Sequence, residues 1–182
     1  MSDFMINTIN KVHEWRQKTD AVAAVESMFV FPVLMTLLFG VVDIGTGVVI
    51  NTKVISAAQI ASDLLTRQNS VNDEDLEQAR LAAQTALIPY YNADDFGLDI
   101  VGIRYEGEEA VSREKWRETY NMSPNENVLN LSDGLGLEGD GVVIVTVEYR
   151  YHPRFSDFLT GDIVMREIAV VKGRDTPYVE RL

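Results

Sequence analysis

The stretch Ala21–Asn51, AVAAVESMFVFPVLMTLLFGVVDIGTGVVIN, constrains this chain more than any other part of it. It contains two charged residues, Glu26 and Asp43, among residues that are otherwise apolar, small or uncharged. A helix that crosses a bilayer needs about 20 mostly apolar residues at a rise of about 1.5 Å each. The sequence therefore predicts a transmembrane helix over residues 21–51, with Asp43 toward one interface.

Two other structures also produce apolar runs. A cleaved secretory signal has an apolar core of about 7–15 residues before its cleavage site, whereas this run is longer and continues into more helical sequence. The core helix of a soluble protein is rarely apolar on all sides over such a length. A membrane anchor therefore fits the sequence better than either alternative.

The flanks of the anchor predict its orientation. Three basic residues, Lys11, Arg16 and Lys18, precede the apolar stretch, and only Lys53 follows soon after it. Basic residues near a membrane span collect on the cytoplasmic side. We therefore expect residues 1–20 to form a cytoplasmic segment of a single-pass protein, with the rest of the chain on the other side of the membrane.

The remaining chain predicts a stem and a head of α+β class. Apolar residues keep a helical spacing beyond Asn51, which indicates an amphipathic stem over residues 52–68. Residues 69–182 form the expected head, with a helix over Glu74–Tyr90 capped by Asn72. A small antiparallel sheet follows it. Strands are expected at Gly97–Tyr105, Val142–Tyr151 and Ile163–Val171, with a strand or loop around Trp116, a long loop over 123–141 holding one helical turn, and a tail over 172–182.

The composition excludes several kinds of function. The formal net charge of −12 argues against a nucleic acid partner, because phosphate binding needs clustered Lys and Arg. The chain has no Cys, so it has neither disulfides nor thiolate metal ligands. The acidic runs lack the ligand spacing of a Ca²⁺ loop, and no phosphate-binding glycine loop is present. We therefore expect no cofactor and no metal.

A catalytic site is also not expected. The chain has two histidines, His13 and His152, which the predicted topology places on opposite sides of the membrane. His152 precedes Pro153 at a strand end, where a solvated histidine is the ordinary finding. An anchored hydrolase that uses His152 is an alternative, and loss of an activity in His152→Ala would support it. The residues favour a non-enzymatic protein.

Several of these residues resemble a known family. Ala23, Ala24 and Val25 before Glu26, the pair Phe31-Pro32 and the run Leu37–Gly45 resemble the TadE-like family, which comprises membrane-anchored, pseudopilin-type proteins of tight-adherence (Tad/Flp) pilus systems. Asp43 stands where that family usually has Glu. Segments of the stem and the strand Gly141–Tyr151 are also similar to the family pattern.

The resemblance implies roles for individual residues. In pilin-like proteins, a Glu five residues into the mature chain neutralises the N-terminal amine of a neighbouring subunit. Glu26 takes this position if a prepilin peptidase cuts between Ala21 and Val22, and Ala21 stands where the usual residue is Gly. The alternative is an uncleaved single-span protein.

The resemblance also implies partners. Pro32, which should kink the helix, and Gly40, Asp43 and Gly45 are expected to pack against other pilus or pseudopilin subunits or against inner-membrane pilus assembly proteins. The expected function is that of a minor pseudopilin or assembly component in pilus biogenesis and cell adhesion. The resemblance implies a place in the bacterial inner membrane with the head in the periplasm, and the alternative is incorporation in a pilus. The alternative is a single-span periplasmic sensor or binding module, and neighbouring genes for a pilus ATPase and a prepilin peptidase would favour the first.

Overall fold

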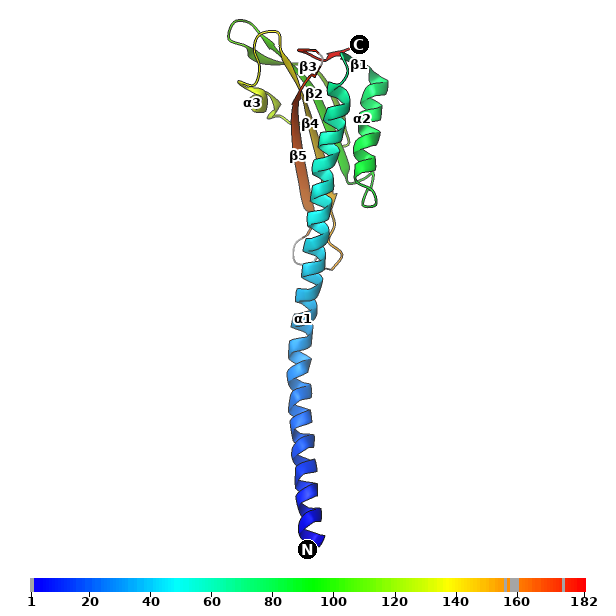
Figure 1. The fold of residues 1–182 in the computed structure, drawn as a ribbon, viewed down its shortest axis with the longest axis vertical. Coiled ribbons are helices and arrows are strands. Elements are labelled where there is room, and N and C mark those ends of the chain that lie inside the picture. The colour runs from blue at the N-terminus through cyan, green and yellow to red at the C-terminus, as the bar shows by residue number, and fades with distance from the viewer. Residues whose placement is uncertain (1, 156, 158–160, 175) are drawn as a thin grey trace. The chain divides into compact units, whose positions relative to one another are not determined.

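The computed structural model describes residues 2–155, 157, 161–174 and 176–182, with side chains from residue 22 onward within these ranges. The chain divides into two compact units, Met1–Ile44 and Gly45–Leu182. Figure 1 shows the elements along the chain. They are α1 (Ser2–Thr66), β1 (Ser70–Val71), α2 (Asp73–Ala86), β2 (Phe96–Glu106), β3 (Val111–Tyr120), α3 (Val128–Ser132), β4 (Gly141–Tyr151), β5 (Ile163–Lys172) and β6 (Glu180–Arg181).

Helix α1 is 65 residues long and passes through both units. We call Val22–Ile44 the membrane half and Gly45–Thr66 the stem half. Pro32 lies inside the helix, which continues on both sides of it. The long apolar helix followed by a small antiparallel sheet confirms the predicted α+β class.

The stem half packs onto the sheet through small and branched side chains. Its inward side chains share one hydrophobic core with α2 and with one face of the sheet. The stem residues of that core, each exposed by 2% or less, are Ile50, Val54, Ala57, Ala58, Ala61 and Leu65. Because alanines recur in this row, the helix backbone can lie close to the sheet.

Helix α2 begins as the sequence predicts. The Asn72 side chain accepts a hydrogen bond from Asp75 N, and the Asp75 carboxylate accepts one from Asn72 N, which together form a capping box. Leu76, Ala79 and Ala83 face the core. The helix ends at Ala86 and not at Tyr90, because residues 87–89 form a turn and Pro89 has no N–H to continue the helix.

The head sheet has the strand order β3-β2-β4-β5, and all its neighbours are antiparallel. The segment around Trp116 is therefore a strand. In β4 the predicted shared face is confirmed, since the odd-numbered residues from Val143 to Tyr151 lie in the core with the stem half. The opposite face carries a second cluster of Val101, Ile103, Tyr105, Val128, Val142 and Ile144, which α3 helps to cover.

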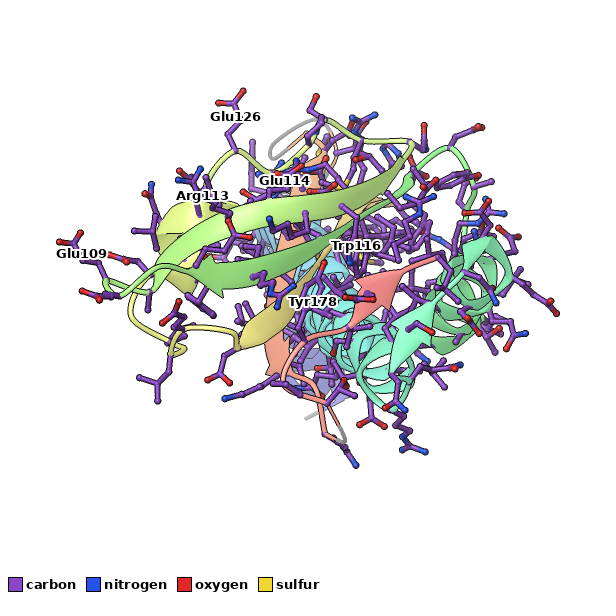
Figure 2. All side chains as sticks on the ribbon, turned by 90° about the horizontal axis from the view of Figure 1, so that it is seen from above. Glu109, Arg113, Glu114, Trp116, Glu126 and Tyr178 are labelled. Atoms are coloured by element: carbon purple, nitrogen blue, oxygen red, sulfur yellow. The ribbon has the colours of Figure 1, made fainter. Side chains whose placement is uncertain are left out.

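The C-terminal residues do not form a free tail. Strand β6 pairs in parallel with β1, and Leu182 N donates to Val71 O at 3.0 Å. The Trp116 indole N–H donates to Val179 O at 3.0 Å. Figure 2 shows Trp116 close to Tyr178 of the same C-terminal segment. The prediction of a tail was therefore wrong for these residues, which close the sheet onto the end of the stem half.

Candidate functional site

The membrane half of α1 exposes many large apolar side chains. Most of its large side chains are more than half exposed, including Met28 (73%), Phe29 (72%) and Val41 (69%). Apolar patches on soluble monomers rarely exceed a few hundred Å². Within the described residues, α1 is long and apolar enough over Val22–Thr66 to cross a membrane. This surface is therefore suited to lipid or to other helices.

The predicted site residues do not all share one face of this helix. At about 100° per residue, Pro32, Gly40 and Asp43 fall within an arc of about 80°. Glu26 lies about 40° beyond that arc, and Gly45 lies on another side of the helix. The helical geometry brings the first three together and separates Gly45 from them.

The surroundings of these residues differ as well. Glu26 is exposed, whereas Asp43 is buried with 4% of its surface accessible. A Cβ atom added to Gly40 or Gly45 would meet no described atom within 4 Å. At Gly47, by contrast, it would meet the rings of Tyr151 at 3.5 Å, so this glycine packs against its own head. Gly40 and Gly45 leave room for another chain.

Pro32 sits in an otherwise regular helix. It has no N–H, so the carbonyl of Met28 loses its usual partner. Four residues later, Thr36 Oγ1 donates to Pro32 O at 2.9 Å. Hydroxyl bonds of this type often bend helices slightly. The expected kink at Pro32 stays a prediction.

His152 lies between two carboxylates in the head. Its Nε2 contacts Asp95 Oδ1 at 2.9 Å, and its Nδ1 contacts Asp162 Oδ1 at 2.5 Å. Hydrogen bonds to Asp95 and Asp162 raise the pKa of the His152 imidazole above its usual value. Both ring nitrogens are engaged, so neither can take a proton from a serine hydroxyl in this arrangement. His152 therefore joins the two loops that hold Asp95 and Asp162, and we call this arrangement the His152 clasp. Its sequence position did not predict this role.

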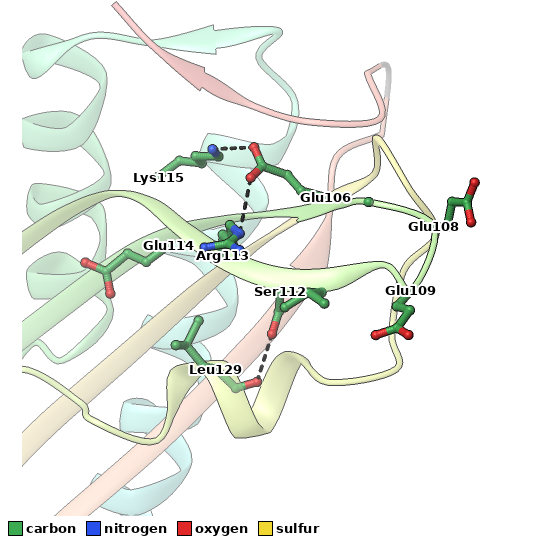
Figure 3. Close-up of a pocket in the computed structure, with 10 residues that line it drawn as sticks. Glu106, Glu108, Glu109, Ser112, Arg113, Glu114, Lys115 and Leu129 are labelled. Atoms are coloured by element: carbon green, nitrogen blue, oxygen red, sulfur yellow. Dashed lines mark hydrogen bonds and ion pairs between the residues drawn. The ribbon is translucent and has the colours of Figure 1, made fainter.

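A groove opens beneath the hairpin of β2 and β3 (Figure 3). Glu106 lines it and pairs with Lys115 and, at 3.4 Å, with Arg113. The hydrogen bond from Lys115 lowers the pKa of the Glu106 carboxyl. On the other wall, Ser112 Oγ donates to Leu129 O at 3.4 Å. In the part of the chain that the structure describes, no group of three His, Cys, Asp or Glu side chains is placed to hold a metal ion.

A comparison with known protein families matches one part of the chain. Residues 21–63 match the family described as TadE-like protein. This TadE-like segment covers the membrane half and nearly all of the stem half, and it includes the residues that the sequence analysis named for processing and helix packing. No curated protein and no solved structure matches the chain. The TadE-like segment therefore indicates involvement in pilus assembly for a chain whose N-terminal helix could span a membrane.

Proposed function

We propose that this protein is a non-enzymatic minor pseudopilin or assembly component of a Tad/Flp-type pilus. The observation that supports this proposal is the TadE-like segment over residues 21–63, whose membrane half is apolar and exposed. The protein acts by packing this helix against other subunits in the inner membrane and by contacts of its head in the periplasm. Its N-terminus lies in the cytoplasm.

In this proposal Glu26 is the residue that selects the neighbour. A carboxylate inside the apolar part of a bilayer costs about 2.5–3.5 kcal/mol on insertion scales. A cationic group of another subunit, such as an N-terminal amine, would offset that cost. Gly40 supplies space for close helix approach on the adjacent face.

The test is the substitution Glu26→Gln in the native host, with Ser27→Ala as the matched control. Glu26→Gln keeps the size of the side chain and removes the charge, so we expect normal membrane insertion and a loss of piliation. Ser27→Ala should leave both unchanged. Unchanged piliation and unchanged subunit co-purification in Glu26→Gln would refute the pairing role.

The processing step is tested separately. The N-terminal mass of the protein from its native membrane is measured with and without the host prepilin peptidase. We expect a chain that begins at Val22 only when the peptidase is present. An intact Met1 in both strains would make the protein a permanently anchored assembly component.

A further inference from the structure

The exposed side of α1 stays apolar beyond the end of the membrane half. Near the start of the stem half, Val48 is 62% exposed and Val49 is exposed as well. The next exposed positions of the helix are Asn51 and Thr52, which are polar. The exposed surface of α1 therefore changes from apolar to polar between Val49 and Asn51.

Two strands of the head meet this part of the helix. A Cβ atom added to Gly47 would meet the Tyr151 ring at 3.5 Å and the Met165 side chain at 3.7 Å. At the other end of the stem half, Arg174 N, two residues beyond β5, donates to Thr66 O at 3.0 Å. Strand β5 therefore runs in the same direction as the stem half, and its first residues lie next to the start of the stem half.

The first residues of β5 are apolar and exposed. Ile163 precedes Met165 by two residues, which is about 7 Å along a strand, and it pairs with Tyr151, the last residue of β4. Both Ile163 and Val164 are exposed, and Val164 has 53% of its surface accessible. In the connection that follows β4, Phe155 is exposed too. Apolar side chains from both strand ends therefore reach solvent at the position along α1 where the exposed side of the helix is still apolar.

We call these residues of the helix and the strand ends the stem-start surface; its members are Val48, Val49, Phe155, Ile163 and Val164. They share a position along α1, and they come from three separate segments of the chain. A bilayer surrounds whatever enters it at a given depth. Side chains that contact lipid must therefore share a depth, but they need not share one face of the protein.

The charges at the two ends of the sheet also differ. The tip of the hairpin between β2 and β3, residues 106–109, holds three acidic residues and no basic one. It lies at the far end of the sheet, because Arg104 pairs with Gly141, the first residue of β4. The end at the stem-start surface carries charges of both signs, and Arg150 and Arg154 are exposed there. Lipid phosphates attract arginine and repel a purely acidic surface, so this end is the one that suits a membrane.

We propose that the stem-start surface is a lipid-contact site, at which the end of the head sheet sits in the headgroup region of the bilayer that α1 crosses. Its apolar side chains lie at the edge of the hydrocarbon, and its arginines lie among the phosphates. The observation that names lipid as the partner is continuity, because Val48 and Val49 extend the exposed apolar surface of a helix that is long and apolar enough to cross a membrane. This inference rests on the proposed membrane anchor and adds the head as a second part of the protein that contacts lipid.

The test measures the depth of single cysteines in the full-length protein, which has no cysteine of its own. The variants Phe155→Cys and Val164→Cys are each labelled with a fluorophore and reconstituted into vesicles of phosphatidylethanolamine and phosphatidylglycerol, some of which carry a nitroxide near the headgroup. The control is Leu137→Cys, because Leu137 is 76% exposed and its carbonyl accepts from Asp140 N at the far end of the sheet. We expect the headgroup nitroxide to quench both test positions at least about threefold more strongly than the control.

The variant Leu37→Cys separates this inference from the proposed anchor. A nitroxide deep in the acyl chains should quench its fluorophore if α1 crosses the bilayer. Quenching at Leu37→Cys, with Phe155→Cys and Val164→Cys quenched no more than Leu137→Cys, would overturn the lipid contact and leave the anchor standing. The same result is expected if a second copy of the chain covers the surface in place of lipid. Absence of quenching at Leu37→Cys would overturn both the anchor and the lipid contact.

Discussion

The two halves of α1 differ in composition and in environment. In the stem half, Val54, Ala57 and Ala58 are fully buried in the head core. In the membrane half, Met28 and Phe29 are more than 70% exposed. Small residues at helical spacing let the stem half approach the sheet, whereas the membrane half is apolar on all sides. One helix thus combines a segment that packs on its own head with a segment whose apolar side chains stay exposed.

The largest effect should come from a charge placed in the stem half. Ala58→Asp buries an unpaired carboxylate against the sheet, and we expect it to lower the free energy of unfolding of the head by about 4 kcal/mol. Denaturant unfolding of the full-length protein in detergent measures this. The neighbouring substitution Gln59→Asp, at an exposed position, should change it by less than about 0.5 kcal/mol. Equal effects at both positions would contradict the stem packing.

A truncation pair compares the two halves directly. Leu65 is 1% exposed and Leu37 is 62% exposed. Leu65→Ala should lower the free energy of unfolding by about 3 kcal/mol, because it leaves a cavity in the core. Leu37→Ala should leave unfolding of the head unchanged within about 0.5 kcal/mol. If the two truncations cost the same, the distinction between the halves fails.

A smaller effect is expected at the C-terminal segment that holds the end of the stem half. Trp116→Phe removes the donor to Val179 O and leaves that buried carbonyl without its partner. We expect a loss of about 1–2 kcal/mol in the free energy of unfolding. Thermal unfolding measures this loss. It is monitored by far-UV circular dichroism, because that signal does not depend on the tryptophan that the variant lacks. A variant as stable as the wild type would show that the hydrogen bond from Trp116 to the C-terminal segment does not stabilise the head.

The smallest effect is expected from His152, which directly follows β4. Its pKa is raised in the folded state by Asp95 and Asp162. The stabilisation is therefore fully present below the unfolded pKa of about 6.5 and is lost as pH rises through the higher folded value. Wild-type stability relative to His152→Gln should fall as the pH rises above about 6.5. A constant difference over this range would contradict the clasp.

Sequence patterns predicted the parts of the head that depend on residues close to one another in the chain. The alternation in Val142–Tyr151 and the cap at Asn72 are short-range signals, and both appear in the structure as predicted. The pairing of Glu180–Arg181 with Ser70–Val71 has no such signal, because each strand is two residues long and its partner is distant in sequence. The His152 clasp likewise joins loops that are separated along the chain.

The same limit applies to the back of the sheet. Asp99 is buried and accepts hydrogen bonds from Thr119 Oγ1 at 2.7 Å and from Asn125 N at 2.9 Å. The Asn125 side chain then donates to Thr146 Oγ1 at 3.1 Å. This network holds the loop before α3 onto the second face of the sheet. The sequence predicted a loop there, but the pairing of distant polar residues could not be read from their spacing.

The most direct test of the account is accessibility along α1 in the native membrane. The chain has no Cys, so single cysteines can be placed at Leu37 and at Gln59 without a background. Both positions are exposed within the chain. A membrane-impermeant maleimide should label Gln59→Cys from the periplasmic side and should leave Leu37→Cys unlabelled until the membrane is dissolved and the protein denatured. Equal labelling of the two in the intact membrane would contradict the division of α1 into a membrane half and a stem half.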